Sequence, residues 1–112
     1  MTQMIAPGEA LLLNSLVTPT AEGIASRILA KTSDGNLTLF AFAAGQGLTE
    51  HTSPFEALVL VLEGGCALKI NGVPVRATPG TVVRMPAGTP HSVEALEATR
   101  MLLVMLRESR RE

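Results

Sequence analysis

The sequence contains no tryptophan, no tyrosine and only three phenylalanines, Phe40, Phe42 and Phe55. Aliphatic side chains must therefore fill the core of a chain in which 46% of the residues are hydrophobic, a share typical of packed globular proteins. A length of 112 residues suffices for one domain and leaves little room for a second. We therefore predict a single domain that spans residues 1–112.

Charge and cysteine are also scarce. Nine basic residues balance ten acidic residues to give a net charge of -1, which excludes a strongly basic surface for nucleic acid or an anionic membrane. Cys66 is the only cysteine, so no disulfide can form within the chain. The N-terminal sequence lacks the pattern of a secretory signal, and no uncharged apolar run approaches the roughly 18 residues of a membrane span. We expect a cytoplasmic protein.

Turn residues divide the chain into short runs that are rich in Val, Leu, Ile and Ala. Pairs such as Asn71-Gly72 and Pro79-Gly80 are typical of tight turns. Many short strands separated by regular turns predict an all-β barrel or sandwich. The last strand is expected over residues 99–106, while residues 1–8 and the polar tail 107–112 are predicted to be loose ends.

The glycine pair Gly64-Gly65 suits the positive φ angles of a tight hairpin, which would set Glu63 opposite Cys66. The period of two then places one apolar set on the inner face: Ala57, Val59, Val61, Leu68 and Ile70. The opposite face carries Leu58, Leu60 and Leu62, where a solvated exterior would be polar. Either the apolar segment 10–17 or a second subunit could cover those leucines. Because the strand 99–106 is also apolar on both faces, we predict a homodimer.

The only two histidines, His51 and His91, lie in the segments 45–64 and 80–95. These segments follow the spacings G-x5-H-x-H-x3-E-x6-G and G-x5-P-x-G-x2-H-x3-N, with the scaffold positions filled by Gly45, Gly64, Gly80, Pro86 and Gly88. In this pattern the chain resembles the cupin family, and in particular its small single-domain, RmlC-like members. The resemblance implies a double-stranded β-helix, the jelly-roll barrel of cupins, which commonly forms dimers.

The resemblance also implies a divalent metal ion held in the barrel by three histidines and a glutamate. Only His51 and His91 occupy ligand positions of that set, whereas Ser53 stands for a histidine and Ala57 for the glutamate. A catalytic metal usually needs at least three protein donors, and neither a neutral hydroxyl nor a methyl group replaces the lost ones. The motif is therefore degenerate. His51 and His91 remain the candidate metal ligands, and a divalent ion is the candidate cofactor.

Other side chains are candidates to replace the missing donors. Glu50 and Glu56 are predicted to point to the opposite faces of their strands. Cys66 should lie about 20 Å along the sheet from Ala57 and is more typical of a buried small hydrophobe. Methionine thioethers beside the two histidines could instead hold copper(I), and the candidates are Met85, Met101 and Met105. Either histidine could also act as a general acid or base.

We expect a mostly apolar pocket lined by His51, Ser53, Ala57, Val59, Met85 and His91, wide enough for one small ligand. Three functions remain open. The first is binding or sensing of a small molecule without a tightly bound metal ion, which the absence of strong donors at Ser53 and Ala57 favours. The second is a metal-dependent enzyme, such as an oxygenase or isomerase, that uses His51 and His91. The third is a structural dimer with a vestigial pocket. The sequence names no catalytic residue.

Overall fold

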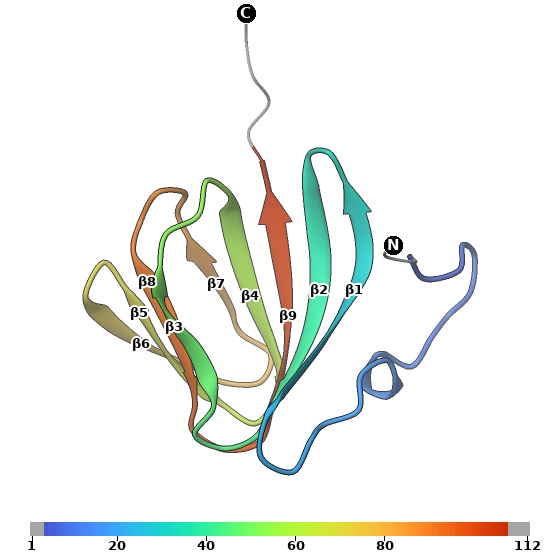
Figure 1. Ribbon diagram of the computed structural model, residues 1–112, viewed down its shortest axis with the longest axis horizontal. Coiled ribbons are helices and arrows are strands. Elements are labelled where there is room, and N and C mark those ends of the chain that lie inside the picture. The colour runs from blue at the N-terminus through green and yellow to red at the C-terminus, as the bar shows by residue number, and fades with distance from the viewer. Residues whose placement is uncertain (1–3, 108–112) are drawn as a thin grey trace, which may run out of the picture.

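The structure, a computed structural model, describes residues 4–107, which form two antiparallel β-sheets that face each other (Figure 1). Sheet A has the strand order β1 (Ile24–Thr32), β2 (Gly35–Phe42), β9 (Thr99–Leu106), β4 (Glu56–Glu63) and β7 (Val82–Met85). Sheet B has the order β3 (Gly47–His51), β8 (His91–Ala95), β5 (Cys66–Ile70) and β6 (Val73–Ala77). The prediction of an all-β jelly roll is confirmed.

The two sheets converge at one end and spread apart at the other (Figure 1). The wide end contains the last residues of β9 and β7 and the first residues of β4 and β8, so it receives both histidines. A short 3-10 helix, η1 (Leu13–Ser15), interrupts the N-terminal segment. Within residues 4–107, no helix is long and apolar enough to cross a membrane.

The core between the sheets follows the two-residue alternation of strands. On β4, Ala57, Val59 and Val61 are buried, and Val59 lies in register with Leu103 on β9. Side chains from both sheets complete this cluster: Phe42, Cys66, Leu68, Ala77, Met85, Val93, Ala95 and Met101. The strand predicted over residues 99–106 is confirmed, with its odd-numbered side chains in the core and its even-numbered ones on the outer face.

The turn at Asn71-Gly72 connects β5 and β6 as predicted. Both residues have positive φ angles, 51° and 81°, which is the requirement of a two-residue hairpin whose twist matches that of its strands. Ile70 and Val73 therefore pair directly across the turn.

The predicted hairpin at Gly64-Gly65 is wrong, because β4 belongs to sheet A and β5 to sheet B. The glycine pair is a corner between the sheets. Thr99 binds it through its hydroxyl, which accepts from the Gly65 N–H at 3.1 Å and lies 2.9 Å from the Gly65 carbonyl. The side chain of Thr99, far along the sequence, thus forms the hydrogen bonds to this turn that a hairpin would have formed between its own strands. Cys66 pairs with Ala77 and Ala95 rather than with Glu63.

The N-terminal segment covers part of the outer face of sheet A. Ile5, Leu13, Leu16 and Val17 pack in a second apolar cluster with several sheet residues, namely Ala25, Leu29, Leu37, Leu39, Ala41, Leu62 and Leu102. The predicted cover by residues 10–17 is therefore correct for Leu62, while Leu58 and Leu60 lie beyond the cluster and stay half-buried.

Both predicted loose ends form backbone hydrogen bonds to sheet A or its β1–β2 turn. The Ile5 N–H donates to the Leu29 carbonyl at 2.9 Å, so the prediction for residues 1–8 is wrong at Ile5. At the other end, the Arg107 N–H donates to the Asp34 carbonyl at 2.7 Å, and its guanidinium lies 5.2 Å from the ring centroid of Phe55. The rest of the predicted tail, residues 108–112, lies outside the described residues, as do residues 1–3.

Candidate metal centre

His51 on β3 and His91 on β8 are direct partners in the strand register of sheet B. The register shifts between Leu48 and His51, so that three steps along β3 match two along β8. Such a bulge reverses the alternation and places Leu48 and His51 on the same face, although they are an odd number of residues apart. Leu48 packs against the core, and the bulge therefore directs His51 toward the inner face as well.

The two imidazole rings meet edge to face, with their centroids 4.4 Å apart and their planes at 75°. Their Nε2 atoms are 3.2 Å apart. The Nδ1 atoms point away to backbone carbonyls, that of Thr49 at 2.7 Å from His51 and that of Thr89 at 3.0 Å from His91. A carbonyl oxygen only accepts hydrogen bonds, so both Nδ1 atoms carry the proton and donate. In the neutral state, each Nε2 then directs a lone pair at the other.

The environment favours the neutral state of His91, whose side chain is only 4% exposed. Burial is the main cause that lowers the pKa of His91 below its ordinary value, and the nearby His51 lowers it further, while the bond to the Thr89 carbonyl opposes both effects. Two neutral rings with facing lone pairs repel each other. A cation or a shared proton removes that repulsion.

The two nitrogens fit a transition-metal ion as a pair of adjacent ligands. Zinc binds imidazole nitrogen at about 2.0–2.1 Å, and two such ligands at a tetrahedral angle lie about 3.3 Å apart. The observed 3.2 Å agrees with that separation.

The remaining motif positions add no third donor. Ser53 uses its hydroxyl to accept the Phe55 N–H at 3.1 Å, and its carbonyl accepts the Gly88 N–H at 2.8 Å. Ala57 is 2% exposed and has no donor atom. Within residues 4–107, no three His, Cys, Asp or Glu side chains gather around a common point.

Glu56 points away from the histidines, as predicted from strand alternation. Its carboxylate forms an ion pair with Arg84 and accepts the Ala87 N–H at 2.9 Å. The Ala87 bond, together with Arg84, lowers the pKa of Glu56. This carboxylate therefore organises the turn after β7 rather than the centre between the sheets.

The sulfur-containing side chains that the sequence offered as ligands lie at different places in the barrel. Cys66 is fully buried among the core residues, where burial raises the pKa of its thiol, and the prediction of a small buried hydrophobe is confirmed. Met85 and Met105 flank Ala57 in register on the inner face, one strand away on either side. Met101 lies deeper on β9 and is 0% exposed. Copper(I) binding by these thioethers stays a prediction.

The predicted pocket residues occupy two environments. Ala57, Val59 and Met85 are part of the packed core, whereas Ser53 is half-buried and His51 is exposed at the wide end. Two polar side chains that the motif spacing did not indicate, Asn36 and Thr38, lie on the inner face of β2. The Thr38 hydroxyl donates a 3.1 Å hydrogen bond to the Asn36 side-chain oxygen. Their alternation with Leu37 and Leu39 in the sequence could have predicted that these two polar residues share one face of the strand.

The jelly roll, together with two motif histidines that meet on neighbouring strands, defines a small barrel protein of the double-stranded β-helix class. Residues 38–106 match the model of the family described as the Cupin domain. The chain therefore belongs to the cupin family. No curated protein matches the sequence.

Solved structures share the fold over nearly the whole chain. A conserved protein of unknown function from Streptococcus pyogenes is 32% identical with a TM-score of 0.90, over 97% of this chain and 96% of that one. A cupin superfamily protein from Desulfitobacterium hafniense is 23% identical with a TM-score of 0.87, over 96% and 99%. An RmlC-like cupin from Shewanella frigidimarina, 13% identical over 94% and 95% of the two chains, shares the fold with a TM-score of 0.77.

Proposed function

We propose that this cupin binds one divalent transition-metal ion between His51 and His91, and that a small molecule completes the coordination of the ion. The observation that carries the proposal is the 3.2 Å separation of two Nε2 atoms whose rings are both oriented through Nδ1. Neutral imidazole binds metal ions through such a lone pair. The proposal joins the predicted small-molecule binding and the predicted metal ligands in one site.

The chain orients both ligands before an ion arrives. Each ring is held by a carbonyl two residues earlier in the sequence, at Thr49 and Thr89, which fixes the tautomer and the direction of Nε2. Because the rings already face each other, an ion would not have to order them. Preorganisation of this kind lowers the entropic cost of binding.

The same donor count supports a small-molecule ligand. Two imidazoles leave at least two positions of a tetrahedral ion open, and the Ser53 hydroxyl is already engaged by the Phe55 N–H. A molecule that offers two oxygen atoms would fill both positions. A bound ion would act there as a Lewis acid that polarises a ligand oxygen.

Calorimetric titration of chelator-treated protein without an affinity tag, with Zn²⁺, tests the metal site. We expect about one ion per chain. His51→Asn and His91→Asn should each weaken binding by about 100-fold or more, because asparagine keeps an N–H for the Thr49 or Thr89 carbonyl and loses the Nε2 lone pair. Glu50→Gln, next to His51 and exposed, is the control and should bind like the original protein.

Loss of affinity in both asparagine variants but not in Glu50→Gln supports the site. Absence of Zn²⁺ binding, or binding that neither asparagine variant weakens, overturns it.

The small-molecule part needs a separate probe, and oxalate is suitable because it offers two oxygen donors. Addition of oxalate should change the visible absorption of the Co²⁺-loaded protein with a saturating curve, and oxalate should not bind the metal-free protein in calorimetry. Equal binding to the metal-free and loaded forms, or no change in the spectrum, would mean that the ion offers no open positions.

A further inference from the structure

One row of residues crosses the inner face of sheet A from the histidine pair to the edge strand β1. From β7 to β1 it consists of Met85, Ala57, Met105, Asn36 and Lys31, each in register with the next. Residues that are direct partners in register share one face of a sheet. Because Met85 and Ala57 are buried between the two sheets, the whole row faces sheet B. A molecule that lay along this row would meet apolar side chains first and polar side chains at the far end.

The apolar end of the row lies next to the proposed ion. Residues 86–90 connect Met85 on sheet A to His91 on sheet B, and residues 52–55 connect His51 to the start of β4, one residue before Ala57. Both connections cross between the sheets at the wide end (Figure 1). A hydrogen bond from the Gly88 N–H to the Ser53 carbonyl, 2.8 Å long, joins them. The histidine pair and the first two residues of the row therefore lie at the same end of the barrel.

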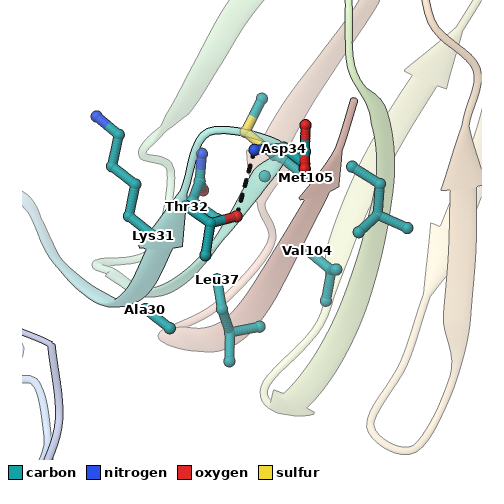
Figure 2. A pocket seen from close by; sticks show the side chains of 10 residues that line it. Ala30, Lys31, Thr32, Asp34, Leu37, Val104 and Met105 are labelled. Carbon is teal, nitrogen blue, oxygen red and sulfur yellow. Dashed lines mark hydrogen bonds between the residues drawn. The ribbon is translucent and has the colours of Figure 1, made fainter. Parts of the chain in front are cut away.

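The polar end of the row depends on a β-bulge in β1. The register of β1 with β2 shifts between Ile28 and Ala30. Regular pairing would set Ala30 opposite Asn36, whereas the additional residue of the bulge sets Lys31 there. Figure 2 shows the Lys31 side chain extending away from that of Leu37, which belongs to the cluster on the outer face. A bulge thus directs Lys31 to the inner face, as the bulge in β3 does for the first histidine.

Asn36 and Lys31 both offer hydrogen-bond donors. The Thr38 hydroxyl donates to the side-chain oxygen of Asn36, so the amide group is oriented with its two N–H donors free, and the amide nitrogen forms no hydrogen bond within residues 4–107. Thr38 is only 8% exposed, which shelters this bond from water. Lys31 is exposed and forms no ion pair in the part of the chain that the structure describes. An amide and an ammonium side by side suit a carboxylate.

We propose that the small molecule of this site is an elongated acid with polar groups at both ends. Two oxygen atoms at one end bind the ion, an apolar middle lies over Met105, and a carboxylate at the other end binds Asn36 and Lys31. This inference rests on the proposed function, because the ion between the histidines holds the first end. No member of the row is acidic, so none repels the second carboxylate.

The spacing of the strands sets the length of the ligand. Neighbouring strands lie about 4.8 Å apart, so Asn36 is roughly 10 Å from Ala57 across the sheet, and Lys31 lies one strand further. The Lys31 stem is long enough to bring its ammonium back toward Asn36. A chain of about six carbon atoms matches this separation, whereas a two-carbon acid such as oxalate is too short to reach Asn36.

Titration of the Co²⁺-loaded protein with 2-oxoadipate and 2-oxohexanoate, followed by visible absorption, tests the inference. Both acids have the same metal-binding end and carbon chain up to the last position, where the first has a carboxylate and the second a methyl group. 2-Oxoadipate should bind about 10-fold more tightly or better. Lys31→Met should remove most of this preference and leave the affinity for oxalate unchanged. Lys69→Met is the matched control, because Lys69 is exposed on the outer face of sheet B, next to the inward-facing Leu68.

Asn36→Asp provides a second variant, since it keeps the oxygen that accepts the Thr38 hydroxyl and replaces the N–H donors with a negative charge. Circular dichroism verifies that each variant is folded. A preference for 2-oxoadipate that Lys31→Met and Asn36→Asp reduce and Lys69→Met retains supports the inference. Equal binding of the two 2-oxo acids while oxalate still binds, or equal loss of the preference in Lys69→Met, overturns the inference alone. No spectral change with oxalate either overturns the proposed function, and the inference with it.

Discussion

His51 and His91 owe their orientation to backbone groups rather than to other side chains. The motif spacing predicted that both residues occupy ligand positions, and the structure places them 3.2 Å apart at Nε2. The bulge at β3 could not be predicted, because the residues between Leu48 and His51 contain no glycine or proline that marks it. The loss of the third and fourth donors was predictable from Ser53 and Ala57 alone.

The buried imidazole of His91 should make the metal-free protein less stable in mild acid. The pKa of His91 is lowered in the folded state, so as the pH falls below the ordinary value of 6.5 the unfolded chain binds a proton before the folded chain does. Stability therefore rises with pH through this range, by at most about 1.4 kcal/mol per pH unit for one group. Urea unfolding with chelator present should give a lower free energy at pH 5.5 than at pH 7.5.

His91→Asn provides the comparison, because it removes the titrating group and keeps an N–H for the Thr89 carbonyl. Its free energy of unfolding should vary less over the same two pH values. An unchanged difference would assign the pH dependence to other groups.

At the scale of elements, Gly64 decides how the chain passes from sheet A to sheet B. Its φ is +82°, and an added Cβ would lie 2.2 Å from the Ala98 carbonyl oxygen and 2.8 Å from the Thr99 Cα. Gly64→Ala should therefore cost roughly 3 kcal/mol or more, from the left-handed backbone and from the overlap together. Gly80→Ala is the control, since Gly80 has φ +87° with nothing within 4 Å of the added Cβ.

Urea unfolding of both variants should show Gly80→Ala losing only the backbone part, about 1–2 kcal/mol. Equal losses would mean that the corner yields to the added methyl group and that its packing does not hold the two sheets together.

The elements differ in how well the sequence predicts them. The strand 99–106 was predicted together with its two faces. Its apolar residues are continuous, so the two-residue alternation alone assigns each side chain to a face. The turn at Asn71-Gly72 was predicted because its φ angles are a local property. The corner at Gly64-Gly65 was not, because it depends on a hydrogen bond to Thr99, 34 residues further along the chain. Turn chemistry indicates that the chain bends there and does not indicate which strands then pair.

For the whole molecule, the apolar side chains do not all lie in the core between the two sheets. A second cluster forms under the N-terminal segment, around Leu29 and Leu39. Leu58 and Leu60 on β4 lie outside both clusters and stay half-buried, on the face for which the sequence predicted a cover. The distribution of apolar side chains over three layers follows from strands that are apolar on both faces, which in an isolated sandwich leaves one outer face unsatisfied.

The homodimer predicted from the apolar outer faces of β4 and β9 should make thermal stability depend on protein concentration. A dimer that forms only from folded chains stabilises the folded state by mass action, so the unfolding midpoint of the original protein should rise by a few degrees between about 10 and about 300 µM. Val73→Lys should show the same rise, because the side chain it replaces lies on the edge of sheet B. The midpoint of Val82→Lys should rise less, because Val82 lies in register with Leu60 on the outer face of sheet A and a lysine there weakens pairing through that face. A constant midpoint in all three proteins would show that folding of this chain does not depend on a second copy, whereas a rise in Val82→Lys equal to that of the original protein would place the association on another face.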